Sequence, residues 1–261
     1  MGLLFDEDIW LSDNRYITPH SDFRYHNFTP ENFDLGDSCV VIFSSDLFRR
    51  VQDSVSTVDE GFVWPYETTP LKICESPSGK RFGLHFPSYG GTRIANSLEQ
   101  LAACGYRYVF GIGLGGTPRD DVEVGDFILL EGAVRGDGVS SYYAPLEFPG
   151  VADFRLTAML MEELEKAGER YHLGISFGVD ALYRETYQLI DRLRKLRVLS
   201  IDLESSAFLT VGRRLNMRCC WTGVVSDRLL SGKHQGSIHS EHVGNSISRL
   251  AGYVLGVIER L

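Results

Sequence analysis

The sequence lacks the patterns that mark several classes of protein. It has no apolar run approaching about 18–20 residues, so no segment is expected to span a membrane. It has no H-E-x-x-H zinc motif and no C-x-x-C pair. The first absence argues against a zinc-protease type of metal site.

Positive charge is also scarce. The chain has 26 Lys and Arg against 35 Asp and Glu, which gives a formal net charge of −9. Nucleic acids and anionic membranes require basic surfaces, so neither is expected as the main partner, although a small anion could still bind a locally positive pocket. The five cysteines are odd in number and mostly lie in apolar runs, and the first residues carry no basic stretch. We therefore expect reduced, buried thiols in a cytoplasmic protein.

The remaining composition is that of a soluble globular chain: 261 residues, 43% apolar and 23% charged. Strand and helix patterns alternate, which predicts an α/β fold with a mixed central sheet covered on both faces. We expect one domain over residues 1–261, with residues 1–37 as an irregular arm. The predicted strands are 39–43, 71–75, 81–86, 106–110, 127–131, 172–177, 198–201 and 218–225. The predicted helices are 47–51, 92–104, 154–167, 184–197, 205–215 and 238–260, and 135–150 is expected to be a loop.

A glycine-rich stretch, residues 111–116 (GIGLGG), follows the predicted strand 106–110. Without Cβ atoms the backbone N–H groups there can approach an anion or a sugar closely. The stretch fits G-x-G-x-x-G, but a dinucleotide site needs a helix directly afterwards, and here a turn and another strand follow. We interpret residues 111–117 as the floor of a ligand site at the end of the sheet.

Two acidic motifs also lie at ends of predicted strands. Asp202 and Glu204 stand at a strand-to-helix junction, where a carboxylate can bind a sugar diol or simply favour the helix start. Asp227 follows an apolar strand, where it can be a general acid or an ordinary turn residue. His239 and His242 are interpreted as surface residues rather than metal ligands.

Taken together, these motifs resemble the nucleoside phosphorylase family that includes uridine phosphorylase and the hexameric purine nucleoside phosphorylases. The resemblance covers residues 39–260. Its most specific parts are residues 122–126 (VEVGD), 135–140 (RGDGVS) and 143–154 (YAPLEFPGVADF), the last very similar to uridine phosphorylase. Residues 202–207 (DLESSA) resemble the family's E-M-E-S-A signature, and residues 226–227 (SD) resemble the purine branch.

The resemblance implies a three-layer α/β/α fold and cleavage of the N-glycosidic bond of a nucleoside, with phosphate as nucleophile. It implies that Glu204 binds the ribose hydroxyls, that Leu203 lies under the sugar and that Asp227 faces the base. It also implies a homodimer or a trimer of dimers, because His26 would reach a neighbouring subunit's site. The candidate catalytic residues are Asp227 and Glu204, and the candidate substrate-binding residues are His26, Arg50, Gly91, Thr92, Gly113, Leu114, Tyr183, Asp202 and Leu203.

The sequence departs from the family at the phosphate ligands. The family's G-D-P-x-R loop is replaced by residues 44–50 (SSDLFRR), which retain Arg50, and its R-x-G-[ST] positions are Gly111 and Leu114 here. Losing an arginine should weaken a phosphate site, so a phosphate-independent hydrolase and a catalytically weak nucleoside-binding protein are alternatives. Residues 143–154 favour a pyrimidine and Asp227 favours a purine or modified base, towards which we lean. No metal or other cofactor is expected beyond phosphate as co-substrate.

Overall fold

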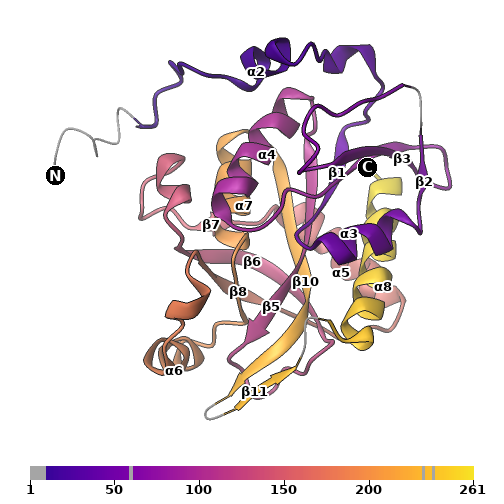
Figure 1. The fold of residues 1–261 in the computed structure, drawn as a ribbon. Coiled ribbons are helices and arrows are strands. Elements are labelled where there is room, and N and C mark those ends of the chain that lie inside the picture. Colours follow the sequence, from indigo (N-terminus) through magenta and orange to yellow (C-terminus); the bar gives the residue numbers. More distant parts are fainter. Residues whose placement is uncertain (1–9, 59–60, 231–232, 237–238) are drawn as a thin grey trace.

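The computed structural model describes residues 10–58, 61–230, 233–236 and 239–261. In them, one mixed sheet of eleven strands runs through the molecule with helices on both faces (Figure 1), which confirms the predicted fold class. The strands are β1 (Ser38–Ile42), β2 (Ser56–Thr57), β3 (Leu71–Glu75), β4 (Arg81–His85), β5 (Tyr108–Thr117), β6 (Phe127–Gly136), β7 (Gly150–Val151), β8 (Tyr171–Val179), β9 (Ser200–Asp202), β10 (Arg218–Leu230) and β11 (Lys233–Gly236).

The two faces of the sheet are buried by different helices. α4 and α7 cover one face, and α3, α5 and α8 cover the other (Figure 1). The helices are α2 (Pro19–Tyr25), α3 (Ser45–Gln52), α4 (Gly91–Ala103), α5 (Phe154–Lys166), α6 (Tyr187–Lys195), α7 (Ser205–Arg214) and α8 (Glu241–Glu259), with short 3-10 turns η2 (Pro30–Asn32), η3 (Val139–Tyr142) and η4 (Leu182–Arg184).

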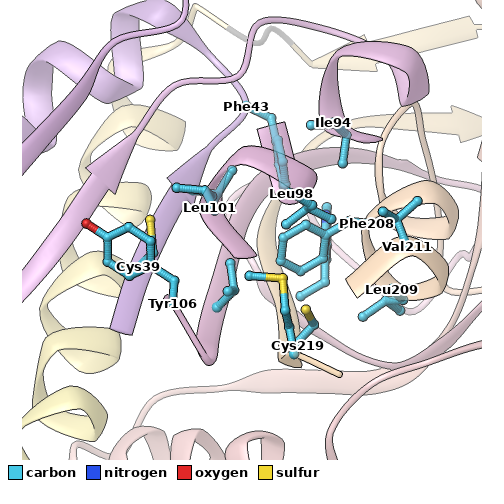
Figure 2. Close-up of a cluster of buried hydrophobic side chains, with 14 of the residues drawn as sticks. Cys39, Phe43, Ile94, Leu98, Leu101, Tyr106, Phe208, Leu209, Val211 and Cys219 are labelled. Atoms are coloured by element: carbon cyan, nitrogen blue, oxygen red, sulfur yellow. The ribbon is translucent and has the colours of Figure 1, made fainter. Parts of the chain in front are cut away.

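Burial on both faces explains why the central strands are continuous apolar runs. In β1, Cys39 and Val41 point to the α4–α7 side, and Val40 and Ile42 point to the other. Successive side chains of a strand alternate between faces, so an apolar residue is needed at every position when both faces are covered. Figure 2 shows the core on the α4–α7 side, where Phe208 meets side chains of the sheet.

Part of the sheet closes on itself. β10 pairs in parallel with β5 and antiparallel with β6, and the path continues from β6 through β8 and β9 back to β5. β1, β4, β3 and β2 extend from β5 as an open sheet. The central layer is therefore a five-strand ring with an open wing, a detail that the predicted three layers did not include.

β5 and β10 are longer than predicted. β5 continues through the glycines to Thr117, so residues 111–117 are strand rather than a loop. β10 does not end at Asp227 but continues to Leu230, with a register shift between Val225 and Asp227. The two strands pair along almost their full length, and this long-range ladder overrides the weak strand preference of glycine.

Other predicted boundaries need smaller corrections. The arm of residues 1–37 contains α2, which starts with a capping box between Thr18 and Ser21, and η2. The loop predicted over 135–150 contains η3 and leads into β7. Residues 1–9 of the arm, and residue 238 at the predicted start of the last helix, lie outside the described residues.

The described ranges also bear on the predictions about membrane spans and cysteines. None of their helices combines the length and the apolar character needed to cross a bilayer. All five cysteines are free thiols, and four of them are buried, as predicted.

Candidate active site

A cavity of about 670 Å³ opens where β1 ends beside the longer strand β5. β1 pairs with β5 only as far as Ile42, opposite Ile112, and the cavity begins at the next residue of β5, Gly113. Its other walls are the start of α3, the junction between β9 and α7, Asp227 of β10 and the start of α8. Segments far apart in the sequence therefore meet at one edge of the sheet.

The glycines of β5 serve two purposes. A Cβ atom added at Gly111 would lie 3.0 Å from the Phe43 ring, and one at Gly113 would lie 2.6 Å from the Trp221 ring. Phe43 in turn packs edge-on against Phe208, with ring centroids 5.6 Å apart (Figure 2). Gly111 is thus buried behind an aromatic ring and does not line the cavity, whereas residues 113–116 do.

Asp202 stands at the end of β9 and supports the start of α7. The backbone N–H groups of Glu204 and Ser205 donate to its Oδ1 at 2.9 and 2.6 Å. Its Oδ2 is buried without a hydrogen-bond partner among the described residues. Burial raises the pKa of Asp202 to about 6. One oxygen of Asp202 thus holds the start of α7, which agrees with the helix-start interpretation, and the other is a buried acceptor without a protein donor in the described ranges.

Glu204 lies two residues further on and is also buried. The backbone N–H of Gly90 donates to its Oε1 at 3.4 Å. Burial, followed by the negative charge of Asp202, raises the pKa of Glu204 to about 8. The raised pKa favours the neutral carboxylic acid, which can both donate a hydrogen bond to a hydroxyl group and accept one from it.

Asp227 enters the cavity from β10 at the irregularity of that strand. The register shift between Val225 and Asp227 leaves Ser226 as an extra residue, and such bulges commonly re-aim a side chain beside a functional site. Ser226 Oγ donates to Asp227 Oδ1 at 2.6 Å. A Cβ atom at Gly116 would lie 2.9 Å from Asp227 Oδ2, so this glycine leaves room for the carboxylate.

The charge around the cavity is mainly negative. Arg50 of α3 is the only Arg or Lys among the described lining residues, and its Nη1 donates to Asn245 Oδ1 at 2.8 Å while its guanidinium packs on Gly244. In the described ranges no group of three or more His, Cys, Asp or Glu is arranged to hold a metal ion. The lining carboxylates are Asp46, Glu185, Asp202, Glu204, Asp227 and Glu241.

Most of the predicted site residues meet in this cavity. Asp227, Glu204, Arg50, Gly113, Leu114, Asp202 and Leu203 all line it. The remaining four, His26, Gly91, Thr92 and Tyr183, do not.

These four lie elsewhere for different reasons. His26 ends α2, where it packs on the Tyr66 ring and its Nε2 lies 3.9 Å from an oxygen of Asp22. Thr92 is exposed inside the first turn of α4, whose N-cap is Gly90, so this helix starts one residue before the predicted residue 92. Tyr183 is 97% exposed. A side chain at Gly91 would meet Val139 rather than the cavity.

Other lining residues were not identified from the sequence. Phe43 is the last residue of the predicted strand 39–43 and the first residue after β1, and that position was the available signal. Tyr89 lies between predicted elements, and Glu185 lies at the start of the predicted helix 184–197 but before the observed α6. His239 was interpreted as a surface residue although it lines the cavity. No local pattern distinguishes these residues, because the cavity is formed by long-range packing.

A partly closed mixed sheet, two helical layers and a cavity with buried carboxylates define an α/β protein with a site for a small polar ligand. A family model described as the phosphorylase superfamily matches residues 73–260. This match covers more than half of the chain, so the protein belongs to the phosphorylase superfamily, as predicted.

Individual proteins that are similar in sequence or structure carry phosphorylase names, which agrees with the family match. The chain is 32% identical over 154 residues to a uridine phosphorylase of Thermococcus kodakarensis, covering 54% of this chain and 56% of that relative. It is 28% identical over 172 residues to a guanosine phosphorylase of Halorubrum lacusprofundi, covering 66% and 67%. A crystal structure of uridine phosphorylase from Vibrio fischeri is similar with a TM-score of 0.76 and 21% identity, covering 87% of this chain and 94% of that one. The chain thus spans little more than half of the Thermococcus relative, and the structural likeness supports the fold alone.

Proposed function

We propose that the protein is a nucleoside phosphorylase that cleaves the N-glycosidic bond of a nucleoside and gives a free base and ribose 1-phosphate. The observation that carries the proposal is the meeting of Glu204, Asp202 and Asp227 in one cavity of a phosphorylase-superfamily fold. The cavity volume, about 670 Å³, suits a small ligand. Relatives described as uridine and guanosine phosphorylases support the same reaction class.

In the proposed reaction, the bond between ribose C1′ and the base nitrogen breaks and its electron pair leaves with the base. A phosphate oxygen forms the new bond to C1′, and positive charge develops on the sugar between the two events. Glu204, supported at the cavity wall by Asp202, holds the ribose hydroxyls. Asp227 faces the base and helps protonate it as it departs, a role that typically contributes about 10²–10⁴-fold in rate.

The test is product analysis with a panel of nucleosides, with and without phosphate. Chromatography quantifies the free base, and phosphorus NMR detects ribose 1-phosphate. We expect base release that depends on phosphate and that Asp227→Asn strongly reduces. Binding of nucleosides without any turnover in phosphate would instead identify a binding protein and overturn the proposal.

Hydrolysis is the second candidate, and one observation favours it. The Phe43 ring packs on Gly111, the position where the family has its phosphate-binding arginine, and Arg50 is the only described lining residue with a guanidinium or ammonium group. A cavity with so little positive charge has few partners for a phosphate dianion. Base release at the same rate with and without phosphate, with ribose as the sugar product, would establish this candidate over phosphorolysis.

The expected co-substrate, oligomeric state and location in the cell belong to the same proposal. Phosphate is the only co-substrate that it requires. A homodimer or trimer of dimers would let His26 of one subunit serve the site of its neighbour, and the expected location is the cytoplasm. Light scattering of the purified protein measures the oligomeric state directly. A monomer that is active in dilute solution would contradict the expected homodimer or trimer of dimers.

A further inference from the structure

The turn after β6 contains a buried carboxyl group that the proposed reaction does not use. Asp137 belongs to the motif of residues 135–140 (RGDGVS), is only 8% exposed and is not among the described residues that line the cavity. It accepts hydrogen bonds from the backbone N–H of Ser140 at 2.7 Å and from Ser140 Oγ at 2.9 Å. Ser206 Oγ, 69 residues further along the chain, donates to the same carboxyl group at 2.5 Å. Three donors thus satisfy this buried group and tie the turn to α7.

Ser206 connects Asp137 to the helix start that carries Glu204. It is the second residue of α7 and is almost fully buried. Glu204 is the N-cap of this helix, and its side chain makes no capping hydrogen bond that would hold it there. A Cβ atom added at Gly178 of β8 would lie 2.0 Å from Ser206 Oγ, so the hydroxyl group also packs against that strand. Ser206 is therefore held by both Asp137 and β8, which fixes the first turn of α7 two residues from Glu204.

The same turn also supports the loop that donates to Glu204. The backbone N–H of Gly90 donates to Glu204 Oε1 at 3.4 Å. A Cβ atom added at Gly91, the next residue, would lie 2.8 Å from Val139 Cγ1, so this loop packs on η3. The two hydrogen bonds within the turn that end on Asp137 fix η3 in its place. Asp137 thus supports both the helix start that carries Glu204 and the loop that donates to it.

We propose that Asp137 is a positioning residue, which holds the carboxyl group of Glu204 in place for the 2′- and 3′-hydroxyls of the ribose. This inference rests on the proposed function, because that function assigns the ribose hydroxyls to Glu204. Asp137 acts through Ser206 and η3 rather than by touching the substrate. A 2′-deoxynucleoside lacks one of the two hydroxyls and therefore depends less on the position of Glu204. The ratio of kcat/KM for a ribonucleoside to kcat/KM for its 2′-deoxy form thus reports that position.

The test measures this ratio for uridine and guanosine against their 2′-deoxy forms in the wild type, Asp137→Asn, Ser206→Ala and a matched control, Asp153→Asn. Asp153 also anchors a helix start, because it accepts from the backbone N–H of Leu156 at 3.0 Å and from Arg218 Nε at 2.8 Å, but it does not line the cavity. Asp137→Asn should lower kcat/KM for the ribonucleoside by about 10- to 100-fold, because a misplacement of about 1 Å can cost about 100-fold, and should lower it less for the 2′-deoxy form. Ser206→Ala should lower the ratio in the same direction. The control should leave the ratio unchanged, since a smaller folded fraction affects both substrates equally.

A wild-type ratio in Asp137→Asn, or in Ser206→Ala if Asp137→Asn does not fold, would overturn the inference and indicate a purely structural role. A wild type that cleaves both sugars equally well would also overturn it.

If the wild type cleaves no nucleoside, the proposed function fails, and carbon-13 NMR titration of Glu204, assigned with Glu204→Gln, then decides the inference. Ser206→Ala changes no charge. It should nevertheless lower the pKa of Glu204 from about 8 towards its ordinary value of 4.5, because water reaches a carboxyl group that is no longer held in its buried position. An unchanged titration of Glu204 in this variant would refute the positioning role.

Discussion

The buried carboxyl group of Glu204 gives the sharpest prediction about stability. In the unfolded chain the pKa of Glu204 is near its ordinary value of 4.5, and in the folded protein burial and Asp202 raise it to about 8. The folded state therefore holds this proton more tightly than the unfolded state. Stability is unaffected by this group below about pH 4.5, falls as pH rises towards 8, and levels off above that.

The size of the effect follows from the pKa difference. At about 1.4 kcal/mol per pKa unit, full ionisation of Glu204 costs the folded state up to about 5 kcal/mol. Glu204→Gln removes this cost, because an amide does not ionise and its oxygen can still accept the hydrogen bond from Gly90. The variant should therefore be more stable than the wild type at pH 9 by several kcal/mol and should differ little from it at pH 5.

Urea unfolding of both proteins at pH 5, 7 and 9 measures this difference, with Glu131→Gln as the control at an exposed position. The same variant should lose most of its activity, because an amide cannot ionise and therefore cannot form the stronger, charge-assisted hydrogen bonds that a carboxylate accepts from the ribose hydroxyls. A stability difference that stays the same at all three pH values would refute the reasoning. It would show that Glu204 ionises in the folded protein as it does in water.

Three further predictions concern the same cavity. Asp227→Asn should lower kcat by about 10²–10⁴-fold with a smaller effect on KM, measured by initial rates, if the residue protonates the departing base. Gly111→Arg should destabilise the fold by about 1–3 kcal/mol, because its Cβ meets the Phe43 ring at 3.0 Å, and Phe43→Ala should recover part of that loss in thermal unfolding. Arg50→Ala should raise KM for phosphate at least tenfold, corresponding to about 1.5–3 kcal/mol for a charged hydrogen bond, and a phosphate-independent rate that it leaves unchanged would indicate hydrolysis.

The fold was largely predictable because its signals are local. Apolar runs such as residues 39–43 and 218–225 predict buried strands, and the stripe of α5 with Asp153 before it predicts a capped helix. The ring closure was not predictable in the same way. It depends on β10 pairing with both β5 and β6, and strand pairing at such sequence separation leaves no mark in either segment.

The candidate site was predictable where a motif carries its chemistry. Asp202, Glu204 and Asp227 stand in short patterns at strand ends, and all three line the cavity. Glu185 and Phe43 were not identified, because no motif distinguishes them from the other residues of a predicted helix and a predicted strand. His26 shows a different limit: its expected role belongs to a neighbouring subunit's site, which a single chain does not contain.

The glycine stretch of β5 shows how one pattern can have two causes. Glycines can clear space for an anion, or they can clear space for the protein's own rings, and the sequence alone does not distinguish the two. Here Phe43 fills the space beside Gly111, while Gly116 leaves room for the carboxylate of Asp227. The same strand thus closes off one end of the expected phosphate position and opens the other end to a group that can protonate a base. The proposed positions of the base and of phosphate therefore lie at different points along β5, and phosphate dependence is the measurement that distinguishes the two candidate reactions.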